Sequence, residues 1–211
     1  MTGLERRLAE AVAAARRGEL VVIPTDTVYG IGTRPDDPVA TTLVFEAKRR
    51  PRDLELPVLV ADLDAARDVA VFDDRADLLA RACWPGPLTI VLERTEDASD
   101  WELGGDRTTV GVRAPRHALA LALLAETGPL AVTSANRSGD RPATTCEEVR
   151  DLFADDVAVF LCQDEPLDGL ASTVIDLAHG PARILRPGAL PARGLGELLP
   201  DERTLLDSPP S

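Results

Sequence analysis

The chain has 211 residues, of which 45% are hydrophobic, and it carries a formal net charge of −13. This size and composition predict a globular protein with one sizeable core. The negative charge repels nucleic acid and anionic lipid on average, so any anionic ligand needs a local basic pocket. No apolar run is long enough to span a bilayer, and the first residues lack a signal-peptide core, so we expect a cytoplasmic protein without membrane contact.

Helical and extended patterns alternate along the first half of the chain. Apolar residues at helical spacing predict a helix over 4–17, and the apolar run 20–23 predicts a strand that opens into a polar stretch at 25–33. Asp37 is a suitable N-cap for a helix that must end before Pro51. We expect further strands at 58–60, 88–92 and 109–113 and further helices at 63–70 and 74–82.

The second half closes the domain and ends in a polar segment. Thr145 and Glu148 have the spacing of a capping box, which predicts a helix up to Phe153. We expect residues 1–194 to form one domain and 195–211 to form a loosely attached polar tail. The remaining elements expected here are a helix at 116–126 and strands at 130–133, 157–161, 172–177 and 183–185. Because strands alternate with helices in places and follow one another directly in others, the sequence predicts an α/β fold with a mixed sheet.

The three cysteines, Cys83, Cys146 and Cys162, are widely spaced, and the chain has only two histidines to assist them. Such spacing predicts neither a disulfide framework nor a zinc site, and we identify no metal-ligating residues. We therefore expect all three cysteines to be small buried hydrophobes.

The only lysine of the chain, Lys48, stands among 22 arginines and is followed by Arg50 two residues later. A lysine ammonium is a compact charge suited to phosphate, whereas a guanidinium is a flat fork. Lys48 is therefore a candidate for chemistry, although a cation at this expected helix end would also offset the helix dipole. We expect the side chains of Lys48 and Arg50 to be largely reachable by solvent.

Four groups of polar residues follow predicted strands or helices. They are Thr25-Asp26-Thr27, the pair Lys48 and Arg50, Ser134-Ala135-Asn136, and Arg186. Strand ends in α/β sheets are where ligands bind, so these groups are candidates for one site. Each group alone also has a structural interpretation as a turn, a helix end, a helix cap or a surface ion pair.

Taken together, seven ordered motifs resemble those of the Sua5/YciO/YrdC family, whose typical members are threonylcarbamoyl-AMP synthases. They span residues 21–190, and the chain resembles the short, single-domain bacterial form. The resemblance implies a twisted sheet of parallel and antiparallel strands, flanked by helices, with a large concave ligand cleft. The motifs are Pro24-Thr25-Asp26-Thr27-Val28-Tyr29-Gly30, Lys48-x-Arg50-Pro51, Trp84-Pro85-Gly86-Pro87-Leu88-Thr89, Val112-Arg113-x-Pro115-x-His117, Ser134-Ala135-Asn136-x-Ser138-Gly139, Ser172-Thr173-Val174-Ile175-Asp176 and Leu185-Arg186-Pro187-Gly188.

The resemblance also implies an activity and the residues that carry it. An L-threonylcarbamoyladenylate synthase forms threonylcarbamoyl-AMP and pyrophosphate from L-threonine, bicarbonate or CO2, and ATP, for the N6-threonylcarbamoyladenosine modification of tRNA position 37. Mg²⁺ would be held largely by ATP, and the product would pass to a downstream tRNA threonylcarbamoyl transferase complex. A weak contact with tRNA is left open. By resemblance, Lys48 and Arg50 are catalytic, Lys48, Arg50, Thr109, Ser134, Asn136 and Arg186 bind ATP, and Thr27, Arg113, Thr133 and Thr173 bind threonine.

One segment departs from the family pattern. Leu54-Glu55-Leu56 precedes Pro57 where the family usually has a polar residue, a proline and an aliphatic residue. The resemblance therefore carries no ATP contact to position 54, and Glu55 brings a negative charge near the expected phosphate pocket.

Three other functions stay open at this point. A carbamoyl-AMP-forming domain like that of hydrogenase maturation proteins would share the fold, although such domains belong to much longer chains. A double-stranded RNA-binding or ribosome-maturation module would share the concave surface, but the net charge of −13 works against it. A diverged YciO-like paralogue without synthase activity is the third. The intact set of Lys48, Arg50, Ser134 and Asn136 argues against it, whereas the Leu54-Glu55-Leu56 segment keeps it open.

Overall fold

Nine strands run through residues 2–202, the part of the chain that the computed structural model describes. They are β1 (Val21–Ile23), β2 (Gly30–Thr33), β3 (Val58–Leu59), β4 (Leu88–Glu93), β5 (Thr109–Arg113), β6 (Leu130–Ser134), β7 (Val159–Phe160), β8 (Thr173–Asp176) and β9 (Arg183–Arg186). They form one open sheet in the order β7-β1-β2-β6-β3-β5-β4-β8-β9. The pairs β1–β7, β3–β5 and β4–β8 are parallel and the other pairs are antiparallel, which confirms the predicted mixed sheet.

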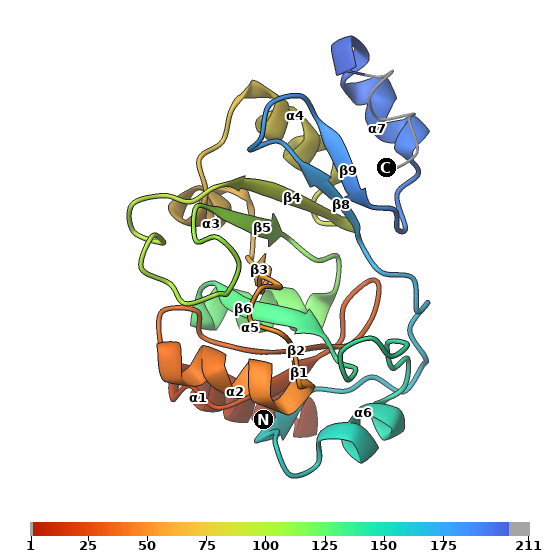
Figure 1. Ribbon diagram of the computed structural model, residues 1–211. Coiled ribbons are helices and arrows are strands. Elements are labelled where there is room, and N and C mark those ends of the chain that lie inside the picture. Colours follow the sequence, from red (N-terminus) through yellow and green to blue (C-terminus); the bar gives the residue numbers. More distant parts are fainter. Residues whose placement is uncertain (1, 203–211) are drawn as a thin grey trace.

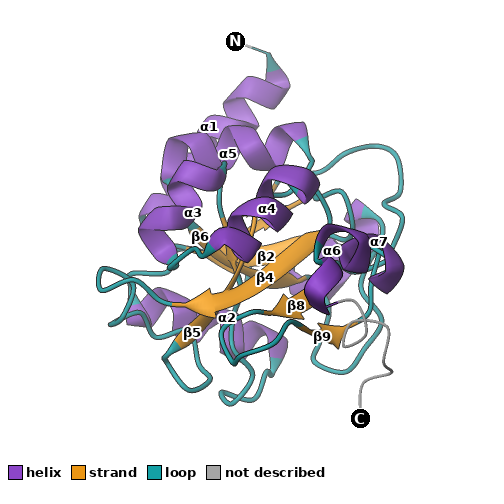
Figure 2. Cartoon of the chain, turned by 90° about the horizontal axis from the view of Figure 1, so that it is seen from above, coloured by secondary structure: helices purple, strands orange, loops and turns teal. Residues whose placement is uncertain are grey.

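Seven α-helices in the described residues surround the sheet (Figure 1, Figure 2). They are α1 (Gly3–Arg16), α2 (Pro38–Lys48), α3 (Leu63–Val69), α4 (Asp74–Cys83), α5 (Ala118–Thr127), α6 (Cys146–Phe153) and α7 (Ala192–Leu198). Figure 1 shows α6 beside the β1 end of the sheet and α7 beside the β9 end. Among residues 2–202, no helix combines the length and the apolar character that crossing a bilayer requires.

The strands separate two clusters of buried apolar side chains. On β1, Val22 belongs to the larger cluster, whereas Val21 and Ile23 belong to the smaller one, as alternation along a strand requires. The smaller cluster is built from α1, α5 and the sheet face that they cover, and these two helices lie side by side (Figure 2). Helices α2, α3, α4, α6 and α7 contribute to the larger cluster.

Local capping explains why the predicted helices begin and end where they do. The Asp37 carboxylate accepts hydrogen bonds from the first backbone N–H groups of α2, and Arg49, with φ 52°, ends that helix in the left-handed region. Lys48 is therefore the last helical residue, as the sequence predicts. The predicted capping box of Thr145 and Glu148 is also confirmed at the start of α6.

The polar stretch expected at 25–33 contains a strand that sequence periodicity does not reveal. Gly30 and Gly32 belong to β2, which pairs with β1 and β6. A Cβ atom on Gly32 would lie 2.3 Å from the carbonyl oxygen of Ala131, so only glycine permits this approach of β6. Glycine is therefore required in β2 because the backbone of β6 packs closely against it, and the strand shows no alternation of apolar residues.

The expected boundary at residue 194 falls inside α7, and the expected loose tail is wrong for the residues that the structure describes. Leu195 and Leu199 are buried in the larger apolar cluster, and a 3-10 turn follows at Pro200–Glu202. Their apolar side chains anchor a segment that looks polar by composition. The rest of the expected tail, 203–211, lies outside the described residues.

The cysteines also differ from expectation. Cys146 and Cys162 form a disulfide, with 5.6 Å between their Cα atoms, and Cys83 is free and half-buried. Cys146 opens α6 and Cys162 follows β7, so the fold brings together two residues that the sequence separates by 16 positions. A single bridge of this kind has no spacing signal, which is why the sequence does not predict it.

Candidate functional site

A cavity of about 290 Å³ lies over the middle of the sheet. Leu59 and Val132 line it and also belong to the cluster under α1 and α5, so the cavity opens on the same sheet face, where these helices no longer cover the strands. Residues of β2, β3, β4, β5, β6, β8 and β9 line the cavity, together with the loops that follow β1 and α2. Six of the predicted site residues line this cavity, namely Thr27, Arg50, Arg113, Thr133, Ser134 and Arg186.

Two arginines supply positive charge to the cavity. The Arg50 guanidinium donates hydrogen bonds to the carbonyl oxygens of Leu54 at 3.1 Å and Glu55 at 2.9 Å, which fixes it against the segment after Pro51. Arg186 donates to the carbonyl of Ser172 at 2.9 Å and to its hydroxyl at 3.0 Å. Burial lowers the pKa of Arg50, and the neighbouring charge of Arg186 lowers it further. Because the charges of Arg50 and Arg186 repel each other across the cavity, an anion bound between them would be favoured.

Lys48 is buried rather than reachable by solvent, so that expectation is wrong: the residue is only 1% exposed. Its ammonium donates to the backbone carbonyls of Ser134 and Asn136, the latter at 2.6 Å, and to the Asn136 amide oxygen at 3.3 Å. An ammonium has three donors, so all of them are occupied by protein oxygens. Burial, with smaller contributions from Arg50 and Arg137, lowers the pKa of Lys48 to about 7.

The loop after β6 is organised around Lys48. The Ser134 hydroxyl donates to the Asn136 amide oxygen, and the Asn136 amide nitrogen donates to the carbonyls of Arg137 at 2.8 Å and Asp140 at 2.7 Å. Ser134 lines the cavity, whereas Asn136 and Lys48 lie directly behind it. These three residues therefore form one connected group next to the cavity, with Ser134 as its exposed member.

Arg113 and Thr27 form a second polar group, at the carboxyl end of β5. The Arg113 guanidinium donates to the Thr27 hydroxyl and to the Gly86 carbonyl, both at 3.0 Å, and forms an ion pair with Asp26. The arginine and aspartate side chains are 7% and 8% exposed. The second carboxylate oxygen of Asp26 is buried and accepts no hydrogen bond within the described residues. Sequence inspection places Asp26 in a motif but gives no sign of this pairing.

The structure does not bring the other predicted threonines into the cavity in the same way. Thr173 is fully buried, and its hydroxyl donates to the Leu190 carbonyl at 2.7 Å. Thr109 is not among the lining residues, and its carbonyl accepts a hydrogen bond from Arg94. Thr133 borders the cavity, but it pairs with Ile31 of the core, so alternation turns its side chain away from that of Ser134.

The departure at Leu54-Glu55-Leu56 has a clear structural basis. Leu56 is fully buried in the core and Leu54 is exposed, whereas Glu55 lines the cavity and forms an ion pair with Arg94 at 2.6 Å. Burial raises the pKa of Glu55 to about 7, against the opposing effect of the Arg94 charge. Arg94 also donates to the Trp101 carbonyl at 2.8 Å. No motif marks Arg94, because its partner lies 39 residues away in the sequence.

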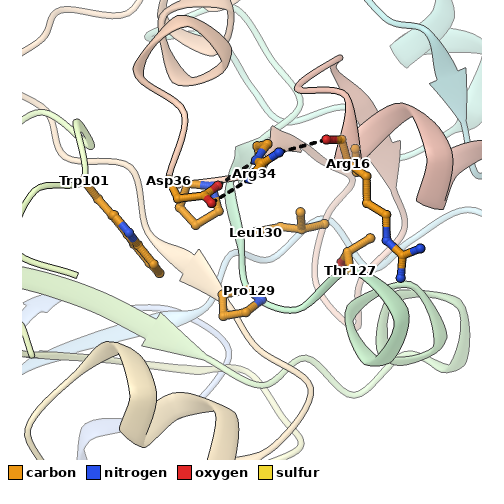
Figure 3. Close-up of a pocket in the computed structure, with 9 residues that line it drawn as sticks. Arg16, Arg34, Asp36, Trp101, Thr127, Pro129 and Leu130 are labelled. Atoms are coloured by element: carbon orange, nitrogen blue, oxygen red, sulfur yellow. Dashed lines mark hydrogen bonds and ion pairs between the residues drawn. The ribbon is translucent and has the colours of Figure 1, made fainter. Parts of the chain in front are cut away.

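A second cavity, of about 200 Å³, lies where the end of α1, the loop after β2 and the turn between α5 and β6 meet (Figure 3). The Arg34 guanidinium in it donates to both oxygens of Asp36 at 2.7 Å and to the Arg16 carbonyl at 3.0 Å. Trp101 forms another part of the wall, as Figure 3 shows. This cavity contains none of the predicted residues. Arg34 and Asp36 pair with each other, and the Arg16 guanidinium pairs with Glu126 outside the cavity lining.

No group of three or more histidine, cysteine or acidic side chains is placed to hold a metal ion within residues 2–202. Glu55, which lines the cavity, and Asp26, which lies against Arg113, are each paired with an arginine. The charged side chains that line the cavity are Arg50, Arg113 and Arg186, together with Glu55.

A family model matches most of the chain and identifies the family to which it belongs. The model of the Sua5_yciO_yrdC family, described as "Telomere recombination", matches residues 13–188. The chain belongs to the Sua5/YciO/YrdC family. That match spans every cavity-lining segment, which agrees with the motif positions in the sequence.

Relatives within the Sua5/YciO/YrdC family are similar along most of the chain. A Mycobacterium tuberculosis protein, provisionally named a threonylcarbamoyl-AMP synthase, is 40% identical over 195 residues, which are 92% of this chain and 89% of that one. The threonylcarbamoyl-AMP synthase of Pyrococcus abyssi is 37% identical over 201 residues, 94% of this chain and 59% of its own length. The crystal structure of P. abyssi Sua5 complexed with L-threonine has a TM-score of 0.84 and 34% identity, covering 94% of this chain and 58% of that one.

Proposed function

We propose that this chain is an L-threonylcarbamoyladenylate synthase, which forms threonylcarbamoyl-AMP and pyrophosphate from L-threonine, bicarbonate or CO2, and ATP. The observation that carries the proposal is the meeting of Arg50, Ser134 and Arg186 with Thr27 and Arg113 in one cavity. The first three residues suit phosphate, and the last two suit an amino acid with a carboxylate. The names of the relatives, and the threonine bound to P. abyssi Sua5, support this division.

The proposed chemistry needs positioning and charge stabilisation rather than a protein nucleophile. Threonine and CO2 form an N-carboxy-threonine, and one oxygen of this carbamate attacks the α-phosphorus of ATP while pyrophosphate leaves with the electron pair of the broken P–O bond. Arg50 and Arg186 balance the negative charge on the phosphates during this step. The protein then acts by holding two substrates in line.

The threonine end of the site is assigned to Thr27, Arg113 and Asp26. Arg113 uses three of its five N–H groups on protein acceptors, so two remain for a carboxylate. The unpaired oxygen of Asp26 lies beside this guanidinium and is an acceptor for the threonine ammonium or hydroxyl group. Buried polar atoms are normally paired, so this oxygen fits a bound ligand.

Lys48 takes part in the proposed site in a different way from Arg50. Because its three donors are occupied, Lys48 contacts a phosphate only by giving up one of the oxygens of Ser134 or Asn136. We assign it two roles, which are to hold the Ser134–Asn136 loop in the free protein and to release one donor to ATP. We leave Thr109 and Thr173 out of the assigned contacts, and Thr133 borders the site without an assigned contact.

The proposed reaction also involves a metal ion and an acceptor for its product. Mg²⁺ is the usual partner of ATP, and the triphosphate itself supplies oxygen ligands for it. Within residues 2–202 no group of three or more acidic, histidine or cysteine side chains is placed to hold a metal ion, so a Mg²⁺ ion would depend mainly on the nucleotide. We propose that the reaction takes place in the cytoplasm and that its reactive product passes to a tRNA threonylcarbamoyl transferase complex.

The test is threonine-dependent release of pyrophosphate from ATP in bicarbonate buffer. We expect Arg50→Ala to lower the rate about a hundredfold, because one lost phosphate contact costs a few kcal/mol in the transition state. Arg52→Ala is the matched control, since Arg52 is exposed, stacks on Phe45 and does not line the cavity. No pyrophosphate release by the unaltered chain, or equal rates for the two variants, would overturn the assignment.

A further inference from the structure

Glu55 presents a carboxylate to a cavity that otherwise collects cations. It lines the cavity next to Arg50, and its side chain is 21% exposed. One carboxylate oxygen accepts a hydrogen bond from Arg94 at 2.6 Å. The other oxygen accepts none from the described residues and is not among the buried polar atoms that lack a partner. One acceptor of this carboxylate is therefore available to a ligand.

The position of Glu55 along the cavity follows from strand register. Arg94, which holds the Glu55 carboxylate, also donates at 2.7 Å to the carbonyl of Thr109, the first residue of β5. Arg113 is the last residue of that strand. Four residues of a strand span about 13 Å, so Glu55 and Arg113 face opposite ends of the cavity. Threonine at Arg113 is then far from Glu55.

The chemistry of ATP decides which of its parts fits at the Glu55 end. The α-phosphorus, which must lie near the threonine carbamate, carries two diverging groups, adenosine and pyrophosphate. A carboxylate in a partly buried site repels the highly charged pyrophosphate. Adenosine is neutral, and its ribose offers two hydroxyl donors close to the α-phosphate. Carboxylates bind ribose hydroxyls in this way at dinucleotide sites of other folds.

Resting on the proposed function, we infer that the free oxygen of Glu55 accepts a hydrogen bond from a ribose hydroxyl of ATP and selects ribonucleotides over deoxyribonucleotides. Arg94 is the positioning residue, because it fixes the carboxylate between the start of β5 and the loop that contains Trp101. Arg50 ties the same segment by its backbone, through the carbonyl of Glu55. In this inference the residue that departs from the family pattern, Glu55, contacts the nucleotide, and its ion pair with Arg94 holds it in position.

A purely structural ion pair makes a different prediction. If Glu55 only ties its segment to Arg94, replacing the carboxylate lowers thermal stability but leaves the choice between ribose and deoxyribose unchanged. The ratio of two nucleotide affinities on one protein separates these cases, because a general loosening of the site weakens both nucleotides together.

The experiment is calorimetric binding of Mg-ATP, Mg-2′-deoxy-ATP and Mg-3′-deoxy-ATP at pH 8, without threonine. Burial raises the pKa of Glu55 to about 7, so the carboxylate is mostly ionised at this pH. We expect the unaltered chain to bind one of the two deoxy nucleotides about tenfold or more weakly than ATP, as for a lost hydrogen bond to a charged group. In Glu55→Gln the same ratio should fall to about threefold or less.

Two further variants keep the test decisive. Glu96→Gln makes the same chemical change at an exposed glutamate outside the cavity and should keep the full ratio. Glu55→Asp keeps the charge and should retain more discrimination than Glu55→Gln. A thermal melt of each variant identifies any that fails to fold, and the pair Glu55→Asp and Glu96→Gln then still compares a moved carboxylate with an untouched one.

Each outcome bears on a defined statement. Equal affinities of the unaltered chain for all three nucleotides overturn the ribose contact, even if threonine-dependent pyrophosphate release is present. If the ratio of the ATP and deoxy-ATP affinities is the same in Glu55→Gln as in the unaltered chain, the ribose contact is also overturned. A lost Mg²⁺ requirement in Glu55→Gln, with the ratio unchanged, would assign the carboxylate to the metal instead. Absence of ATP binding under any condition overturns the proposed function and this inference together.

Discussion

Lys48 is the only lysine of the chain, so its ionisation can be followed without interference from another lysine. Protein made with ¹³C-labelled lysine should give one side-chain NMR signal that titrates with pH. In the free protein we expect its midpoint near the lowered pKa of about 7, compared with 10.5 for an exposed lysine. This difference corresponds to about 5 kcal/mol of disfavoured charge. The pKa of Lys48 is lowered because the ammonium is buried next to Ser134. The three oxygen atoms that accept its hydrogen bonds favour the charged form and oppose this effect.

ATP should move this midpoint upward by at least about one pH unit, since a nearby triphosphate favours the ammonium. ATP binding should therefore weaken as pH rises above 7, with proton uptake on binding. Lys48→Arg, which stays charged, is the control and should bind ATP without this dependence. A free-protein midpoint near 10.5, or one that ATP leaves unchanged, would refute the reasoning that Lys48 is a buried donor exchanged to phosphate.

The same burial predicts a stability effect with a definite sign. The unfolded chain holds the Lys48 proton up to about pH 10.5, whereas the folded chain releases it near 7, so the free energy of unfolding should rise with pH between these values. Between pH 7 and 8.5 the rise is up to about 2 kcal/mol. Lys48→Met should lack it, and urea unfolding at the two pH values measures the difference. Identical pH dependence in both proteins would contradict the assignment.

Three further predictions test other contacts. Arg113→Lys should raise the threonine concentration for half-maximal pyrophosphate release about tenfold or more, while the ATP concentration required changes less than about threefold. The reason is that the two-pronged guanidinium is lost but the positive charge is kept. Equal changes for both substrates would contradict the assignment of Arg113 to threonine. Glu55→Pro removes the carboxylate partner of the buried Arg94 guanidinium and leaves it only two backbone carbonyls. The variant should lose about 3 kcal/mol of stability in a denaturant titration, and no loss would show that the pair is not formed. A thiol-reactive dye should label one cysteine per unfolded chain without reductant and three with reductant. Cys146→Ser should lower the free energy of unfolding by about 3 kcal/mol, because the loop that the disulfide to Cys162 closes is opened. Three reactive thiols without reductant would exclude the disulfide.

Much of the fold is predictable because its signals are local. Helix α2 is capped by Asp37 and ends before Pro51 for reasons contained in a few neighbouring residues, and the capping box of α6 is equally local. Strand β2 is different, since Gly30 and Gly32 carry no apolar pattern and are required by the approach of another strand. Likewise, the segment around Leu195 is folded because Leu195 packs into the larger apolar cluster, whose other residues are distant in the sequence, and composition does not reveal this contact.

The candidate site divides in the same way. Polar residues after strands predict that Thr27, Ser134 and Arg186 meet, because strand ends in α/β sheets are where ligands bind, whereas Arg113 is identified only by the family resemblance. The burial of Lys48 depends on a loop 86 residues away, and the pairing of Glu55 depends on Arg94, so neither is written in a motif. Thr173 shows that a hydroxyl in a matching motif can bond to a backbone carbonyl instead of facing the cavity.

The most direct test of the proposed function is to follow the carbon of bicarbonate into the product. The chain is incubated with ATP, Mg²⁺ and L-threonine in ¹²C- or ¹³C-bicarbonate, and the adenylates are separated by mass spectrometry. We predict a threonine-containing adenylate that is heavier by one mass unit with the ¹³C label and is absent when threonine is omitted. AMP or pyrophosphate formed without this labelled adenylate, or no turnover of ATP at all, would contradict the synthase activity.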